Sequence, residues 1–171
     1  MQRVRVLEPE EMLFREGTPF QAPFIVTSGC LELILTMPDG RERVVAFRVP
    51  GEMVGLESWN RDVHRYSARA ITQSTLCRLR WNKASSRRNA ALMSSLLAKM
   101  SADAERNGIP WPGLPAIERV RAFIEDFRNR TDQPLPMTRA QIGSHLGMAE
   151  ETVVRAMKTL RLRGTGRAMP D

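Results

Sequence analysis

The 171-residue sequence has few of the residues on which metal sites and many enzymes depend. It contains two cysteines, Cys30 and Cys77, and two histidines, His64 and His145. A structural zinc site needs four ligands, and cupin-type metal enzymes on a double-sheet barrel gather several histidines with a carboxylate. The sequence also has no glycine-rich phosphate loop, nucleophile elbow or recognisable carboxylate pair. We therefore expect neither a metal site nor enzymatic activity.

Long apolar runs are also missing. No run approaches the ~20 residues that a membrane-spanning helix needs, and residues 1–5 lack the apolar core of a signal peptide. These absences predict a cytoplasmic protein with no membrane partner. In that reducing compartment, Cys30 and Cys77 are expected to be buried thiols and not a disulfide.

What the sequence does have is a strong excess of positive charge. The net charge is +7 and the isoelectric point is near 10.6, which favours a polyanionic partner. From Arg155 to Arg167 the basic residues follow one another without an intervening acid. A charge run by itself is usually a solvated helix face, but this run coincides with the helical motif described below. The charge distribution therefore favours a nucleic acid.

The first part of the chain is predicted to be a β-structure. Residues 24–26, 30–36 and 43–49 read as short strands, separated by turn residues such as Pro38-Asp39-Gly40. Residues 77–81 alternate apolar and basic side chains, as in a half-buried strand. Short strands separated by turns at regular intervals predict an antiparallel β-roll, a double-sheet arrangement like a jelly roll, over residues 1–82.

Residues 83–106 contain no proline or glycine and are predicted to form one helix. Its apolar residues are spaced alternately three and four apart in a narrow stripe: Ala90, Met93, Leu97, Met100 and Ala104. Such a stripe favours pairing with a second copy of the chain, and the alternative is a helix packed on its own roll. The proline-rich residues 107–115 are predicted to be a linker.

Residues 116–171 are predicted to form a helix-turn-helix domain. Apolar residues recur at helical spacing from Ile117 to Phe127. Thr138 and Gln141 form a capping box, which marks the start of a short helix, and Gly147 lies where that helix must stop and turn. A second helix is expected from Glu150. Two short helices joined by a tight glycine turn are the minimal helix-turn-helix.

The second helix of this motif carries side chains suited to reading DNA. Glu151 and Arg155 are four residues apart and share a face, with Thr152 and Lys158 beside them. Arginine can pair with guanine, and glutamate accepts from cytosine. Arg139, at the start of the first helix, is suited to hold a phosphate. The alternative for Glu151 and Arg155 is a surface ion pair of about 0.3–0.5 kcal/mol, but the pattern of residues 137–160 as a whole favours DNA.

Several motifs resemble the CRP/FNR superfamily of bacterial transcription regulators, in particular an FNR-like branch without the cysteine cluster. The matching motifs are Leu13-Phe14-Arg15-Glu16-Gly17-Thr18-Pro19, Val26-Thr27-Ser28-Gly29, Asp39-Gly40-Arg41-Glu42, Pro50-Gly51-Glu52-Met53-Val54-Gly55 and Glu151-Thr152-Val153-Val154-Arg155. The resemblance implies an α+β protein with a sensor roll, a dimerisation helix and a C-terminal winged helix-turn-helix. It further implies a homodimer that binds double-stranded DNA in a sequence-specific way and has RNA polymerase as a further partner.

By the same resemblance, Glu151 and Arg155 read bases, whereas Thr152 and Arg139 contact the DNA backbone. The FNR-like branch usually has serine where this chain has Val154. The residues after Gly164 are too few for the family's hairpin, so a truncated wing is expected. That truncation suggests an alternative function. The chain would then be a regulator-like interaction protein without a wing, which dimerises or binds protein partners but does not bind DNA.

The resemblance also bears on cofactors. Members that bind cyclic AMP use a Gly-Glu pair and an Arg-Ser pair, which makes Glu52, Arg65 and Ser67 the candidate ligand residues. The FNR-like branch keeps the Pro-Gly-Glu turn without binding a nucleotide. An iron–sulfur cluster needs four thiolates, and only Cys77 matches a ligand position.

Neither of the two histidines is expected to bind a ligand. His64 could be an axial haem ligand, but a lone histidine in a loop-like segment is expected to be a surface residue. His145, inside the first helix of the motif, is expected to be a partly exposed packing residue. Together these points predict that the protein holds no cofactor.

Overall fold

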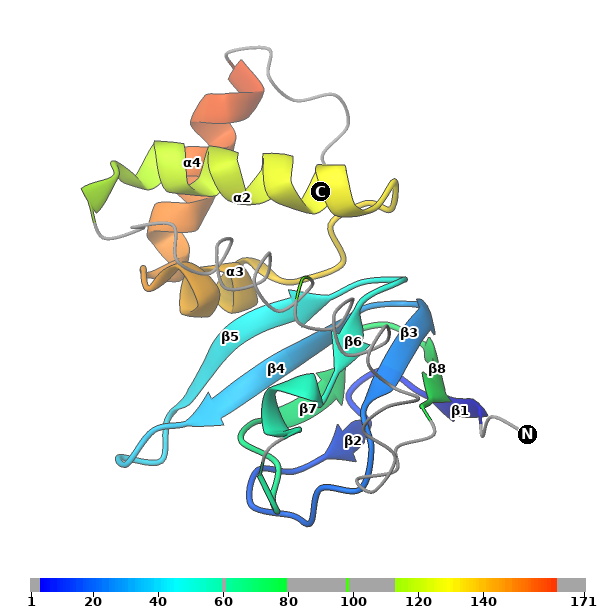
Figure 1. Cartoon of the computed structure of the whole chain (residues 1–171). Helices are drawn as coiled ribbons and strands as arrows, with labels where there is room; N and C mark the ends of the chain where they lie inside the picture. Colours follow the sequence, from blue (N-terminus) through cyan, green and yellow to red (C-terminus); the bar gives the residue numbers. More distant parts are fainter. Residues whose placement is uncertain (1–3, 60, 80–97, 99–112, 163–171) are drawn as a thin grey trace.

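The computed structural model describes residues 4–59, 61–79, 98 and 113–162. Two parts are seen: a β-roll formed by residues 4–79 and a helical unit formed by residues 116–162, which lies against one side of the roll (Figure 1). The helix expected at 83–106 lies outside the described residues except for Ala98, as do most of the expected linker and the residues after 162, where a truncated wing was expected. Within the described ranges, no helix is long and apolar enough to cross a membrane.

The β-roll consists of two four-stranded antiparallel sheets, which confirms the double-sheet prediction. One sheet has the order β1-β8-β3-β6 and the other has the order β2-β7-β4-β5. The elements are β1 (Val4–Leu7), β2 (Met12–Phe14), β3 (Phe24–Ser28), β4 (Leu31–Thr36), β5 (Glu42–Arg48), β6 (Met53–Val54), the 3-10 helix η1 (Leu56–Ser58), β7 (Ser67–Ala70) and β8 (Ser74–Arg78).

Buried aliphatic side chains fill the space between the two sheets, among them Val26, Leu33 and Leu76. Strand β8 begins earlier than the alternation of residues 77–81 suggested, and its inward side chains are Ser74 and Leu76. Cys77 is therefore only half-buried, so the prediction of two buried thiols holds for Cys30 and is wrong for Cys77. Both cysteines are free.

The helical unit contains α2 (Ala116–Arg130), α3 (Arg139–Leu146) and α4 (Glu150–Leu162). The capping box at the start of α3 is present: the Thr138 side chain accepts from the Gln141 backbone, and the Gln141 side chain accepts from Thr138. At the end of α3, Gly147 has φ +64°, a conformation that glycine adopts without strain. The predicted helix-turn-helix is thus formed as expected.

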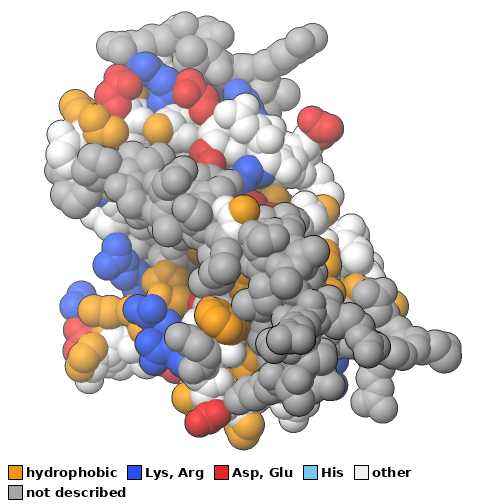
Figure 2. Space-filling view, in the orientation of Figure 1, with side chains coloured by type: hydrophobic (Ala, Val, Ile, Leu, Met, Phe, Trp, Pro, Cys, Tyr) orange, Lys and Arg blue, Asp and Glu red, His pale blue; other side chains and the backbone are white. Residues whose placement is uncertain are grey.

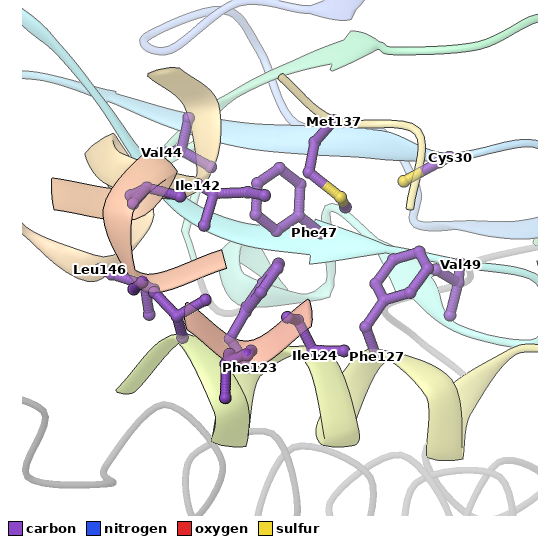
Figure 3. Close-up of a cluster of buried hydrophobic side chains, with 14 residues drawn as sticks. Cys30, Val44, Phe47, Val49, Phe123, Ile124, Phe127, Met137, Ile142 and Leu146 are labelled. Carbon is purple, nitrogen blue, oxygen red and sulfur yellow. The ribbon is translucent and has the colours of Figure 1, made fainter. Parts of the chain in front are cut away.

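A shared apolar core joins the helical unit to the β-roll. Phe47 and Val49 at the end of β5 and just beyond it point toward α2, where they meet Phe123 and Phe127 (Figure 3). The Phe47 and Phe123 ring centroids are 5.7 Å apart in an edge-to-face arrangement. Helix α3 also packs directly on β5, so both α2 and α3 contact the roll.

Candidate nucleic-acid interface

Helix α4 has two faces of opposite character. Val153, Ala156 and Leu160 are buried and hold the helix against α2 and α3. Glu151, Arg155 and Lys158 are exposed, and their spacing of four and three residues places them on the opposite side. This trio is named here the exposed α4 face. Three of the side chains that the sequence singled out are therefore brought together on one surface.

The alternative interpretation of Glu151 and Arg155 was an ion pair between them. Among the described residues, no ion pair joins these two side chains. Thr152, the remaining candidate on α4, is half-buried and lies toward the edge of the exposed α4 face. The carboxylate and the guanidinium can consequently each bind a separate partner.

A groove of about 600 Å³ runs beside the exposed α4 face, between the start of α3 and residues 154–161 of α4. Met137, Ile142 and Met157 supply apolar lining. Arg139, the first residue of α3, lines the same groove as Lys158 and Arg161, so both helices contribute cations to it. Arg139 and Lys158 are themselves exposed. This arrangement suits a polyanion that passes over both helices.

Charge alone does not single out this surface. Figure 2 shows Lys and Arg side chains over the helical unit and over the β-roll. What distinguishes the exposed α4 face is that its side chains lie on one regular helix in a helix-turn-helix, the geometry that enters a DNA major groove.

The turn between α3 and α4 is held tightly. A Cβ at Gly143 would come 2.7 Å from the carbonyl oxygen of Met148, so the turn lies closer to α3 than any larger residue at position 143 permits. Arg119 of α2 donates to the Leu146 carbonyl at the end of α3. Arg119 was not identified from the sequence, because a helix-end carbonyl has no sequence signal.

Polar contacts attach the helix-turn-helix to the roll through α3, among them hydrogen bonds of the Gln141 and Ser144 side chains. The Gln141 amide nitrogen donates to Glu32 Oε2 at 3.2 Å, and the Val44 backbone N–H donates to Ser144 Oγ at 3.0 Å. Glu32 is fully buried and is paired with Arg69, whose Nε donates to Glu32 Oε1 at 2.7 Å. Buried carboxylates are retained when charged partners and hydrogen bonds satisfy them, as here.

A third contact comes from the end of α2. Arg130 Nη1 donates to the Glu52 carboxylate at 3.2 Å and to the Phe47 carbonyl at 3.2 Å, while its Nε lies 2.9 Å from Asp126 Oδ2. Glu52 also accepts from the Val49 backbone N–H at 3.2 Å. Glu52, a candidate nucleotide ligand by the resemblance, is therefore already bound by a residue of the helical unit.

The other two candidate ligand residues have separate partners. The Arg65 guanidinium lies over the Tyr66 ring, 5.2 Å from its centroid. Ser67 is buried in β7, where its Oγ accepts from the Glu16 backbone N–H at 2.9 Å. Tyr66, which interrupts the Arg-Ser pair, thus holds Arg65 by a cation–π contact.

His64 is not the surface residue that the sequence suggested. It is 5% exposed, stacked on Phe14 with ring centroids 3.6 Å apart, and it meets the edge of Phe20 at 5.4 Å. Burial lowers the pKa of His64, and the nearby Glu57 charge opposes that shift. Loop-like sequence misled the prediction because the two phenylalanines lie far from His64 in the chain.

His145 is a half-buried packing residue, as expected. Its ring lies 5.3 Å from Phe47 and 5.6 Å from Phe123. Burial lowers its pKa to about 4, helped by the charges of Arg130, Arg43 and Arg48 and opposed by a hydrogen bond with the Val44 backbone. Over the described ranges, no group of three or more potential ligands could hold a metal ion.

Two family models match the chain. A cyclic nucleotide-binding domain matches residues 4–86, and a Crp-like helix-turn-helix domain matches residues 118–167. The two matches correspond to the β-roll and to the helical unit.

Curated relatives and a solved structure agree with these models. The transcriptional activator protein Anr of Pseudomonas aeruginosa is 32% identical over 184 residues, covering 96% of this chain and 72% of the relative. The nitrogen fixation regulation protein FixK of Rhizobium meliloti is 30% identical over 164 residues, covering 94% of this chain and 76% of the relative. The structure of FixK2 from Bradyrhizobium japonicum superimposes with a TM-score of 0.80 at 27% identity, covering 99% of this chain and 90% of that chain.

Proposed function

Because the chain belongs to the CRP/FNR superfamily of DNA-binding transcription regulators, we propose that it acts as a homodimer whose two α4 helices enter the DNA major groove. Its relatives are regulators and not enzymes. The observation that carries the proposal is the exposed α4 face, on which Glu151, Arg155 and Lys158 lie opposite a buried face.

Each side chain has a role that follows from its chemistry. Arg155 donates two hydrogen bonds to O6 and N7 of a guanine, and Glu151 accepts one from N4 of a cytosine. Thr152, Arg139 and Lys158 contact the phosphate backbone and so fix the position of the helix. Arg139 and Lys158 line one groove and reach the backbone from two different helices.

The homodimer follows from the way such helices bind DNA. Two-fold related helices meet half-sites about 10 bp apart, one helical turn of the duplex. The narrow apolar stripe expected in residues 83–106 is the proposed dimer contact. RNA polymerase is a proposed further partner, which the name of the activator Anr supports.

The roll is proposed to work without a cofactor. Glu52 is bound to Arg130, so a nucleotide at Glu52 would have to break a contact between the two parts of the molecule. For haem, His64 is buried, with the Phe14 ring on one face of its imidazole and Phe20 edge-on to it, which is the environment of a histidine packed in a core.

A gel shift with genomic DNA fragments tests the proposal. The full chain, with its dimeric state measured in the same buffer, should retain specific fragments, and retention should weaken steeply with added salt as counterions return to the phosphates. A folded dimer that retains no specific fragment at low salt would instead support a protein-interaction role.

A further inference from the structure

One exposed residue next to the base-reading side chains is not charged. Val154 is 41% exposed and stands between Glu151 and Lys158 in the sequence of α4. An isolated exposed valine is common on protein surfaces and by itself indicates nothing. The position of this valine is what distinguishes it.

Helix geometry puts Val154 beside the exposed α4 face. With 3.6 residues per turn, it lies roughly 60° around the helix from Glu151 and roughly 40° from Lys158. It also lines the groove to which Arg139 contributes from α3. Val154 is thus an apolar group set among cations on the surface proposed to meet DNA.

The major groove offers few partners to such a side chain. Valine has no hydrogen-bonding group, and the apolar feature on the major-groove edges of the bases is the C5-methyl group of thymine. A β-branched side chain in a helix has one strongly preferred rotamer, so its two methyl groups are already oriented before binding.

We propose that Val154 reads the methyl group of one thymine in each half-site, adjacent to the base pairs contacted by Glu151 and Arg155. This inference rests on the proposed function, because it requires α4 to lie in the major groove. It adds a preference for thymine over cytosine that neither the carboxylate nor the guanidinium supplies.

Deoxyuridine substitution tests the proposal directly, because uracil lacks only the methyl group and keeps the O4 acceptor. A site is first selected with the wild-type chain, and each thymine is then replaced in turn by deoxyuridine. Burial of one methyl group corresponds to about a fourfold change in affinity. We expect about a fourfold loss per half-site at one thymine position and little change at the others.

Two variants complete the test. Val154→Ala, which removes the two Cγ methyl groups, should make the difference in affinity between the thymine site and the deoxyuridine site clearly smaller than in wild type, with an unchanged unfolding midpoint. The matched control Lys158→Ala should bind both sites more weakly but keep the fourfold difference between them.

The possible failures are distinguishable. A wild-type chain that binds its site specifically but tolerates deoxyuridine at every position overturns the role of Val154 and leaves the proposed function intact. A methyl effect of undiminished size in Val154→Ala also overturns it, because another residue would then read the methyl group. If no specific DNA site exists, both proposals fail.

Discussion

The Gln141 side chain contacts the fully buried Glu32 across 109 positions of sequence: Gln141 Nε2 donates to Glu32 Oε2 at 3.2 Å. The Oε1 of the same side chain accepts from the Thr138 backbone N–H at 2.8 Å. One carboxamide therefore caps helix α3 with its oxygen and attaches that helix to the β-roll with its nitrogen. Glutamate could do only the first of these.

Gln141→Glu separates the two roles. Glutamate satisfies a capping box as well as glutamine does, but it places a second carboxylate beside Glu32. We expect unfolding in urea to show a loss of about 1–3 kcal/mol relative to wild type. Gln141→Ala, which loses both bonds, is the matched control. A Gln141→Glu chain as stable as wild type would show that capping is the whole role of this residue.

Glu52→Gln tests the contact between Glu52 and Arg130. Both side chains are largely buried, and the substitution removes a charged acceptor while keeping the side-chain shape. We expect a loss of about 1–2 kcal/mol in the free energy of unfolding, measured with urea. Arg65→Gln, which changes a guanidinium placed over Tyr66 at the surface, should leave stability within about 0.5 kcal/mol of wild type. Equal stability of Glu52→Gln and wild type would remove the argument against a nucleotide at Glu52.

His145 makes stability depend on pH. Its pKa is about 4 in the folded chain, against 6.5 for an unperturbed histidine, so unfolding takes up a proton between these values. Stability should therefore fall as the pH drops from about 6.5 to about 4, by at most about 3 kcal/mol from this residue. The measurement is the unfolding free energy at several pH values for wild type and His145→Asn. The variant should have the shallower pH dependence, and an equally steep one would be evidence that His145 titrates normally.

Arg139→Ala tests the proposed contact between Arg139 and a DNA phosphate. A phosphate contact carries no sequence information, so specific and random duplexes should lose about the same factor in affinity. The slope of log affinity against log salt should become shallower by about one unit. Binding measured by fluorescence anisotropy at four salt concentrations gives both quantities. A loss confined to the specific duplex would instead assign Arg139 to base reading.

Local signals made the helix-turn-helix predictable from the sequence. The cap at Thr138, the left-handed glycine at Gly147 and the helical spacing of buried residues act within a few positions of one another. The same spacing indicated which side of α4 is exposed, and hence that Glu151 and Arg155 share a face.

Contacts between distant segments were not predictable in this way. Nothing near Glu52 in the sequence indicates that Arg130, 78 positions later, is its partner. The burial of His64 depends on Phe14, which lies in strand β2. Which side chains of β8 point inward depends on the pairing of β8 with β1 and β3. These features result from the packing of the sheets and of the helical unit, which periodicity within one segment does not encode.

Selection of bound sequences from a random DNA pool, performed in parallel with wild type and Arg155→Ala, tests the central claim most directly. The wild-type chain should enrich two inverted half-sites with centres about 10 bp apart. Arg155→Ala should enrich the same arrangement with the preference lost at one base pair per half-site, a discrimination of about 1–3 kcal/mol. No enrichment by the wild-type chain, or an unchanged preference in the variant, would contradict base reading by α4.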